Sequence, residues 1–360
     1  MARSGSPACM GLGLAGRLSL PVLHRLLTAG AAGFASLIFG KEGLMALRST
    51  HRIHLGSKAR QFSVLVGQSA VEPVLGEAGE VKSPPDGELG LTFVGHSTFV
   101  VQLARRTVIV DPNFARWLMV LKRQRTPGVA LRDLPPIDMV LLTHAHMDHL
   151  HKPSLRRIIR ETIARTGVAP MAVTPEHVGD LLRGMGFREV VELNWWESHR
   201  TMGLEIIHTP ARHWGARMVS DTHRGYGGYV VRGGGHSIYH AGDTAYFDGF
   251  REIGEKLKPE IALLPIGAYS PEHFRSVHTS PEDALRGFVE MDARWMVPMH
   301  YGSFRLSHEP MEEPVPRLLV AALQAGVRDR IRVLKEGVTE FFEQDEAPAV
   351  ELPDEVVRAV

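Results

Sequence analysis

Cysteine is almost absent from this chain of 360 residues, since Cys9 is the only one. No disulfide can form within the chain, and a metal site built from several thiolates is excluded. Net charge is also nearly absent, because 41 lysines and arginines face 40 aspartates and glutamates. A chain so balanced has no general attraction for nucleic acid, and no such partner is expected. Because a thiolate site is excluded, any bound metal must be held by histidine and carboxylate.

Acidic residues are missing from the first 41 positions, where basic residues lie in a stretch rich in glycine, alanine and leucine. A signal peptide is not expected, because Arg17 and Arg25 interrupt the apolar segment. The longest clean apolar run, Leu26 to Gly40, is too short to span a bilayer comfortably. We interpret residues 1–60 as a basic apolar leader, disordered or peripheral to a membrane, with a start at Met45 as the alternative. The expected location is cytoplasmic or peripheral to a membrane.

Proline, glycine and acidic residues between positions 67 and 90 are typical of a linker. We therefore expect a linker over 61–88, a folded domain over 89–345 and a tail over 346–360. Within the domain, short apolar runs alternate with turn signals and with helical periodicity at 155–163 and 178–182. This alternation predicts an α/β fold with helices on the outer faces of a sheet. The predicted strands cover 91–95, 98–103, 107–111, 138–144, 171–174, 204–209, 228–232, 237–242, 261–267 and 295–300.

Two segments resemble each other, STFVVQLARRTVIVDP and GGYVVRGGGHSIYHAGDT. Each consists of a predicted strand, a tight polar turn, a second strand and then an aspartate. The resemblance indicates two similar halves, each with a hairpin-bearing sheet.

Histidines are crowded into the run THAHMDHLH, directly after a predicted strand. Imidazole and carboxylate groups are donors that zinc accepts, as do iron and manganese. Alternate residues of an extended turn point to opposite sides, so His144 and His146 can share one ion while Asp148 and His149 reach a second. Six positions cannot complete two coordination shells, so further ligands are required.

Candidates for these ligands follow other predicted strands, namely His213, Asp243 and His300. Strand ends fix the backbone while the loop leaves the side chain free to act, which is where site residues are expected.

Most of the nineteen histidines have no partner that the sequence reveals, so surface or core roles are expected for them. His96, His151 and His240 lie beside motif positions and could orient a ligand rather than bind a metal.

The run from His144 to His149 resembles the signature of metallo-β-lactamase-fold hydrolases. This resemblance implies a four-layer αββα sandwich with metals at one edge, between the sheets. From about residue 91 to 340, the chain resembles the branch that contains the N-acyl-phosphatidylethanolamine-hydrolysing phospholipase D. The motifs that carry the resemblance are FVGHSTFVVQL, VDPNFA, THAHMDHLHKPSL, NWWE, TPARHWGAR, GDTAYF, LLPIGAYSPEHF, VHTSPEDA and MHYGSF.

The resemblance also implies two zinc ions per chain and an additional active-site histidine, His278, near the scissile phosphate. The alternative for His278 is a flanking position before the helix that Ser280 and Pro281 begin. The implied metal ligands are His144, His146 and His213 for one ion, Asp148, His149 and His300 for the other, and Asp243 as a bridge.

Two divalent ions about 3.5 to 4 Å apart would make hydroxide available from a bridging water and stabilise negative charge on a phosphoryl group. Asp148 could accept the proton of the water, and His278 could stabilise a phosphoryl oxygen or protonate the leaving alkoxide. The leading hypothesis is a phosphodiesterase that cleaves N-acyl-phosphatidylethanolamine or a related phospholipid. A lactonase, a hydrolase of a soluble phosphodiester and a non-catalytic membrane-associated metal protein are the alternatives.

The stretch FARWLMVLKRQR, residues 114–125, combines Trp117, Leu118 and Met119 with basic residues. This pattern is typical of a surface that contacts a membrane with anionic headgroups. It also fits a buried segment that ends in a solvated basic cap, which is the favoured interpretation. The sequence leaves the oligomeric state open, a homodimer included.

Overall fold

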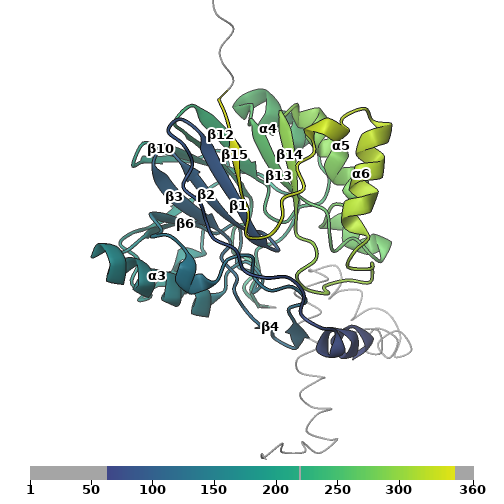
Figure 1. The fold of residues 1–360 in the computed structure, drawn as a ribbon, viewed down its shortest axis with the longest axis horizontal. Coiled ribbons are helices and arrows are strands. Elements are labelled where there is room, and N and C mark those ends of the chain that lie inside the picture. Colours follow the sequence, from purple (N-terminus) through teal and green to yellow (C-terminus); the bar gives the residue numbers. More distant parts are fainter. Residues whose placement is uncertain (1–62, 219, 345–360) are drawn as a thin grey trace, which may run out of the picture.

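Two β-sheets pack face to face and helices cover their outer surfaces, as the computed structural model shows for residues 63–218 and 220–344 (Figure 1). The predicted four-layer α/β sandwich is therefore confirmed. The predictions for residues 1–60 and for the tail over 346–360 lie outside the described residues.

The first sheet has seven strands and the second has six. The first runs in the order β15 (Thr339–Phe342), β1 (Leu89–Gly95), β2 (Thr98–Leu103), β3 (Arg106–Val110), β6 (Met139–Leu141), β7 (Met171–Pro175) and β8 (Val190–Leu193). The second runs in the order β14 (Trp295–Met299), β13 (Ile261–Pro265), β12 (His236–His240), β11 (Gly228–Gly233), β10 (Leu204–Thr209) and β9 (Ser198–Thr201).

The two similar segments form hairpins in different sheets, β2–β3 in the first and β11–β12 in the second. Each hairpin is antiparallel and is followed by a parallel strand, β6 beside β3 and β13 beside β12. Each hairpin also leads into an aspartate, Asp111 in the first sheet and Asp243 in the second. The two halves therefore deliver equivalent carboxylates from opposite sheets.

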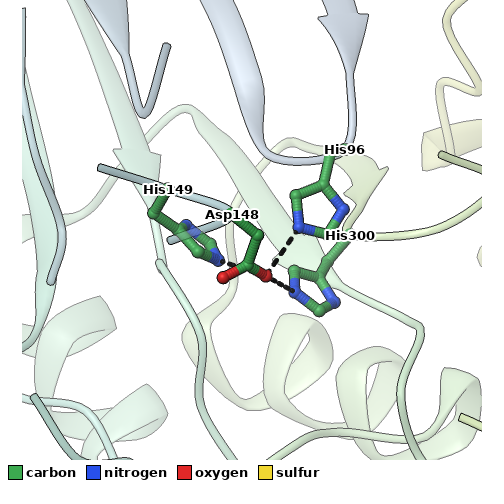
Figure 2. Close-up of side chains that lie close together, drawn as sticks. All are labelled: His96, Asp148, His149 and His300. Atoms are coloured by element: carbon green, nitrogen blue, oxygen red, sulfur yellow. Dashed lines mark hydrogen bonds and ion pairs between the residues drawn. The ribbon is translucent and has the colours of Figure 1, made fainter. Parts of the chain in front are cut away.

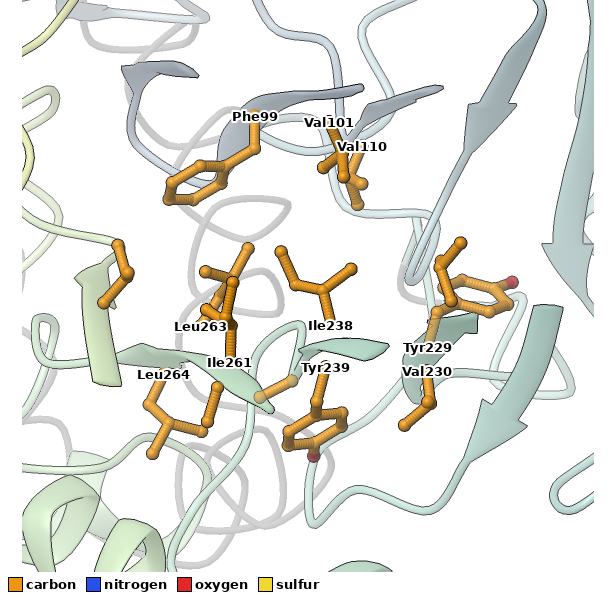
Figure 3. Packing of buried hydrophobic residues seen from close by; sticks show 14 of the residues in the cluster. Phe99, Val101, Val110, Tyr229, Val230, Ile238, Tyr239, Ile261, Leu263 and Leu264 are labelled. Atoms are coloured by element: carbon orange, nitrogen blue, oxygen red, sulfur yellow. The ribbon is translucent and has the colours of Figure 1, made fainter. Parts of the chain in front are cut away.

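The main core lies between the two sheets, because every second side chain of a strand points into this layer (Figure 3). Phe99 and Val101 of β2 face Ile238 and Leu263 of the second sheet. Leu264, the next residue along β13, points to the opposite side, toward the helical layer. Burial on both faces explains why these strands read as continuous apolar runs.

Helices complete the outer layers. Besides the helix over 63–71, they include α3 (Lys152–Thr166), α4 (Gly249–Leu257), α5 (Pro281–Met291) and α6 (Pro314–Gln324), with 3-10 turns η1 (Leu131–Asp133), η2 (Gly179–Leu182), η3 (Glu272–Ser276) and η4 (Arg328–Arg330). Helix α3 buries Leu155 and Ile158 against the first sheet, whereas Ile163, the last residue of the predicted helical periodicity, is 41% exposed. It ends where Gly167 adopts a left-handed conformation, with φ of 73°. The helix predicted over 178–182 is only the turn η2.

Residues 63–88, which the sequence indicated as a linker, pack against the domain. Residues 63–71 are helical, and Ser69 is buried with its hydroxyl 2.7 Å from the backbone nitrogen of Lys122. The backbone of Gly79 bonds to that of Gly128, and a Cβ on Gly79 would lie 2.3 Å from the carbonyl oxygen of Gly337. These glycines therefore permit close backbone contact, which composition alone cannot distinguish from flexibility.

A short hairpin, β4 (Trp117–Leu118) and β5 (Leu121–Lys122), forms within the stretch for which a membrane-contacting surface was predicted. Leu118 is 2% exposed and cannot contact a membrane, whereas Trp117 and Met119 are 46% and 44% exposed. The following Arg123 is buried rather than a solvated cap, because it donates hydrogen bonds to the carbonyl oxygens of Ala115 and Asn113. Among the described helices, none has the length and hydropathy needed to cross a membrane.

Candidate metal centre

The predicted site residues converge at one edge of the two sheets, because most of them follow strands that end at this edge. His144 to His149 follow β6, and His213 follows β10 from the opposite sheet. Asp243 follows β12, His300 follows β14, and His278 precedes α5. The structure brings all of them together as buried side chains.

Asp243 lies at the centre of this cluster. Its Oδ2 atom is 3.2 Å from Nε2 of His149 and 3.1 Å from Nε2 of His300. The same oxygen is 4.0 Å from Nε2 of His144 and 3.9 Å from Nε2 of His213. One carboxylate oxygen therefore faces imidazoles of both predicted ligand sets.

Among the described residues, three groups of side chains have ligand atoms close enough to surround a cation. One is Asp243, His278 and His300, and the other two correspond to the predicted ligand sets. In the group that contains Asp148, the Oδ2 atom of this residue lies 3.5 Å from Nε2 of His149 and 3.6 Å from Nε2 of His300 (Figure 2). The same oxygen lies 2.9 Å from Nε2 of His96, which the sequence did not place among the ligands. The other two groups are His144, His146, His213 and Asp243, and His96, Asp148, His149 and His300.

Electrostatics divide the imidazoles into two kinds. Burial lowers the pKa of His146 to about 4, and burial with neighbouring histidines holds the pKa values of His144 and His213 well below the ordinary value. These rings are neutral near pH 7, the form in which imidazole binds metals. Burial also opposes charge on His300, but Asp243 and Asp148 outweigh it and raise the pKa of His300 to about 9. The carboxylates thus create a negative potential that favours positive charge.

The residues fit a cation because several buried donor atoms lack hydrogen-bond partners. These atoms include Nε2 of His146, His149 and His300, and Oδ1 of Asp243. An unsatisfied buried polar atom costs about 1–3 kcal/mol, so a protein rarely retains several at one place without a compensating ligand. Coordination of a divalent cation by nitrogen and oxygen would satisfy them.

Supporting contacts fix the orientations of the rings. Asp111 is fully buried and accepts hydrogen bonds from Nδ1 of His149 at 2.7 Å and from the hydroxyl of Thr143 at 2.6 Å. His213 donates from Nδ1 to the carbonyl oxygen of Val277. Such contacts set which nitrogen of each ring faces the site. Asp111 was not selected from the sequence, although its place after the first hairpin matches that of Asp243 after the second.

His278 lies beside the predicted ligands and also shortly before α5. Its Nε2 atom lies 3.6 Å from Oδ2 of Asp243, and its Nδ1 atom is buried without a hydrogen-bond partner. It also precedes Ser280, which caps α5 reciprocally with Asp283. The capped helix therefore holds His278 at the edge of the site.

His151 and His240, which the sequence suggested as orienting groups together with His96, contact structural residues instead of predicted ligands. His151 Nδ1 lies 2.7 Å from the hydroxyl of Ser154, and His240 Nε2 bonds to the carbonyl oxygen of Ser97. Of the three candidates, His96 contacts a predicted metal ligand.

An apolar cluster lies beside the site. Met147, which separates two predicted ligands, packs with Leu121 of the hairpin and with Phe274 of η3. Val66 of the helix over 63–71 and Leu306 belong to the same cluster. The site thus borders an apolar wall that connects to the exposed hairpin.

Comparison with known proteins agrees with this geometry. Residues 106–301 match the family described as the beta-lactamase superfamily domain. The chain is 33% identical to the N-acyl-phosphatidylethanolamine-hydrolyzing phospholipase D 1 of Caenorhabditis elegans over 226 residues, which cover 59% of this chain and 64% of that protein. The chain therefore spans less than two thirds of that relative, as it does of proteins from Mycobacterium tuberculosis matched at 34% identity.

Other relatives match along nearly their whole length. A metal-dependent hydrolase of Caldivirga maquilingensis is 33% identical, and the match covers 69% of this chain and 95% of that protein. The solved structure of Igni18, a metallo hydrolase from Ignicoccus hospitalis, is 27% identical with a TM-score of 0.55, covering 71% of this chain and 99% of that one. With a family match over more than half of its length, the chain belongs to the beta-lactamase superfamily, among its metal-dependent hydrolases.

Proposed function

We propose that the chain is a binuclear metal hydrolase that cleaves the phosphodiester bond of N-acyl-phosphatidylethanolamine or a related phospholipid. The position of Asp243 carries this proposal, because one oxygen lies within 4.0 Å of imidazole nitrogens from both ligand groups. A carboxylate so placed can bridge two cations, which suits two zinc ions, with iron or manganese as alternatives.

The ligand roles divide along the two groups. His144, His146 and His213 would hold one ion, and Asp148, His149 and His300 would hold the other, with Asp243 shared. A bound pair of divalent ions supplies an activated water and stabilises charge that develops on phosphoryl oxygens.

Asp148 and His278 would orient the attacking water and protonate the leaving group during cleavage. Asp148 remains ionised near pH 7 despite burial, because His149, His300 and His96 hold its pKa well below the usual range. It can accept a hydrogen bond from the attacking water and keep that water oriented. His278, on the other side of Asp243, can donate a proton to the departing alkoxide through Nε2.

A lipid substrate is supported by the apolar cluster and by the phospholipase relative from C. elegans. Leu121 and Phe274 are buried, so the partly buried Met147 and Leu306 would be the members of this cluster that contact an acyl chain beside the charged site. The exposed Trp117 and Met119 lie on the same hairpin as Leu121 and would make the peripheral contact with a membrane.

The test uses purified protein loaded with zinc and vesicles that contain N-acyl-phosphatidylethanolamine. Release of N-acylethanolamine together with phosphatidic acid is expected, with two ions bound per chain. Asp243→Asn should lose both turnover and full metal content, whereas Asp248→Asn, an exposed position at the start of α4 that belongs to none of the ligand groups, should keep both. Turnover of lactones or soluble phosphodiesters without vesicle cleavage would reject the lipid substrate, and full activity with less than one ion per chain would reject the binuclear site.

A further inference from the structure

His96 occupies a turn that reaches the metal centre from β1 and β2. The register of β1 against β2 shifts between Phe93 and Gly95, and the chain then turns through His96 with φ of 60°. Register irregularities of this kind often re-aim a side chain beside a functional site. Here the ring is buried, being 1% exposed, and extends toward Asp148 (Figure 2).

Two contacts connect this turn to residues of the second ligand group. Nε2 of His96 lies 2.9 Å from Oδ2 of Asp148. The carbonyl oxygen of His96 accepts a hydrogen bond from the backbone nitrogen of His300 at 2.8 Å, and the two rings lie 4.2 Å apart. Because His300 comes from the second sheet, one residue fixes ligands that different halves of the fold supply.

We infer that His96 is a positioning residue, which orients the carboxylate of Asp148 for the second metal ion without binding that ion itself. A carboxylate can only accept hydrogen bonds, so Nε2 of His96 must carry the hydrogen in this contact. A nitrogen that carries a hydrogen has no lone pair left for a cation. This role rests on the proposed function, since it requires that Asp148 hold an ion.

Asp148 needs such a partner because two further imidazoles, those of His149 and His300, also lie near its Oδ2 atom. Without His96, the carboxylate could rotate toward His149 or His300, both of which lie within 3.6 Å of the same oxygen. Rotation would change which oxygen faces the site. Loss of an outer hydrogen bond to a metal ligand typically weakens metal binding about 10–100-fold.

The test compares His96→Gln with His96→Asn. The amide nitrogen of glutamine extends about as far as Nε2 of histidine and can donate the same hydrogen bond, whereas asparagine is too short. Asparagine tolerates a positive φ better than most residues, so its metal-free fold should be at least as stable as that of the glutamine variant. Thermal unfolding of both metal-free proteins checks this order.

Zinc binding is measured by titration of metal-free full-length protein against a coloured chelator, and the spectrum of the cobalt-loaded protein reports coordination. We expect His96→Gln to bind two ions within a few-fold of the natural affinity and to keep the cobalt spectrum. His96→Asn should bind the weaker ion about 10–100-fold less tightly.

Loss of an ion from His96→Gln would overturn the inference, because an amide does not replace a ligating imidazole. Natural affinity in both variants would also overturn it. If His96→Asn does not fold, the glutamine variant alone decides between a positioning and a ligating histidine. Failure of the unaltered protein to bind two ions would instead reject the proposed binuclear site.

Discussion

Asp111 follows β3 and His149 lies in the loop after β6, and the two meet through a 2.7 Å contact between Oδ2 and Nδ1 at a fully buried position. This contact leaves Nε2 of His149 directed toward Asp243, 3.2 Å away. Asp111 also accepts hydrogen bonds from the backbone nitrogen and the hydroxyl of Thr143. One carboxylate therefore fixes both a predicted ligand and the start of the histidine-rich loop.

Asp111→Asn should weaken metal binding about 10–100-fold, since the amide group would replace one acceptor with a donor that faces other donors. Zinc titration of the metal-free protein measures the effect. Asp86→Asn is the matched control, because Asp86 is exposed and pairs only with the exposed Arg105 among the contacts described. Unchanged affinity in Asp111→Asn would show that His149 keeps its orientation without this carboxylate.

Removal of metal should lower the stability of the folded protein. Buried carboxylates and imidazoles with unsatisfied atoms would remain without a cation. At a free ion concentration of 100 times Kd, binding to the folded state contributes about 2.7 kcal/mol to the free energy of unfolding. Thermal unfolding with and without a chelator measures this contribution. His213→Ala, which should bind metal poorly, should show a smaller chelator effect than the unaltered protein, and an equal effect would contradict the site.

Much of the fold was readable from the sequence because buried strands are apolar on both faces. The runs over 98–103 and 261–267 both contain central strands of the sandwich. Strands β8 and β9 escaped prediction because their residues are mostly exposed or half-buried and carry no apolar run. Their pairing depends on neighbouring strands rather than on their own pattern.

Much of the candidate site was also predicted from the sequence. His144 to His149 are close in the chain, so their spacing is visible, and His213 and His300 follow recognisable strands. Asp111 was not selected, and His96 was considered only as one of three possible orienting groups, because each is a single polar residue after an ordinary strand. Their roles arise only when the sheets bring distant turns together, and no local spacing encodes that contact.

His236 should make stability depend on pH. Its Nδ1 atom lies 2.8 Å from Oε2 of Glu260 and its Nε2 atom 2.9 Å from the carbonyl oxygen of Gly87. Both oxygens can only accept, so the arrangement favours the doubly protonated ring. The hydrogen bond to Glu260 is the largest cause that raises the pKa of His236 above 6.5, although burial opposes it.

Because the pKa is raised in the folded state, the stabilisation is complete below about pH 6.5 and is lost as pH rises through the folded-state value. The free energy of unfolding should therefore fall more between pH 6 and 9 for the natural protein than for His236→Gln. Denaturant unfolding with chelator present at every pH measures this and removes the contribution of metal binding. The exposed His223→Gln serves as control, and parallel profiles for His236→Gln and the natural protein would contradict the linkage.

In the β4–β5 hairpin, Leu118 packs in the interior while the adjacent Trp117 is exposed at the surface. Leu118 is buried, so Leu118→Ala should cost about 2–5 kcal/mol of stability. Trp117 is 46% exposed, so Trp117→Ser should leave the free energy of unfolding nearly unchanged. If the hairpin contacts lipid, Trp117→Ser should instead reduce binding to vesicles, because apolar area that would enter the interface is lost.

Cosedimentation with phosphatidylcholine vesicles, with and without an anionic lipid, measures this contact. Val190→Ser provides a control, because Val190 is an exposed apolar residue on β8, in a different part of the fold. Equal loss in Trp117→Ser and Val190→Ser would indicate a general effect of surface hydrophobicity. A selective loss in Trp117→Ser, with unchanged stability, would assign the membrane contact to the hairpin, whose Leu121 packs with Met147 beside the metal centre.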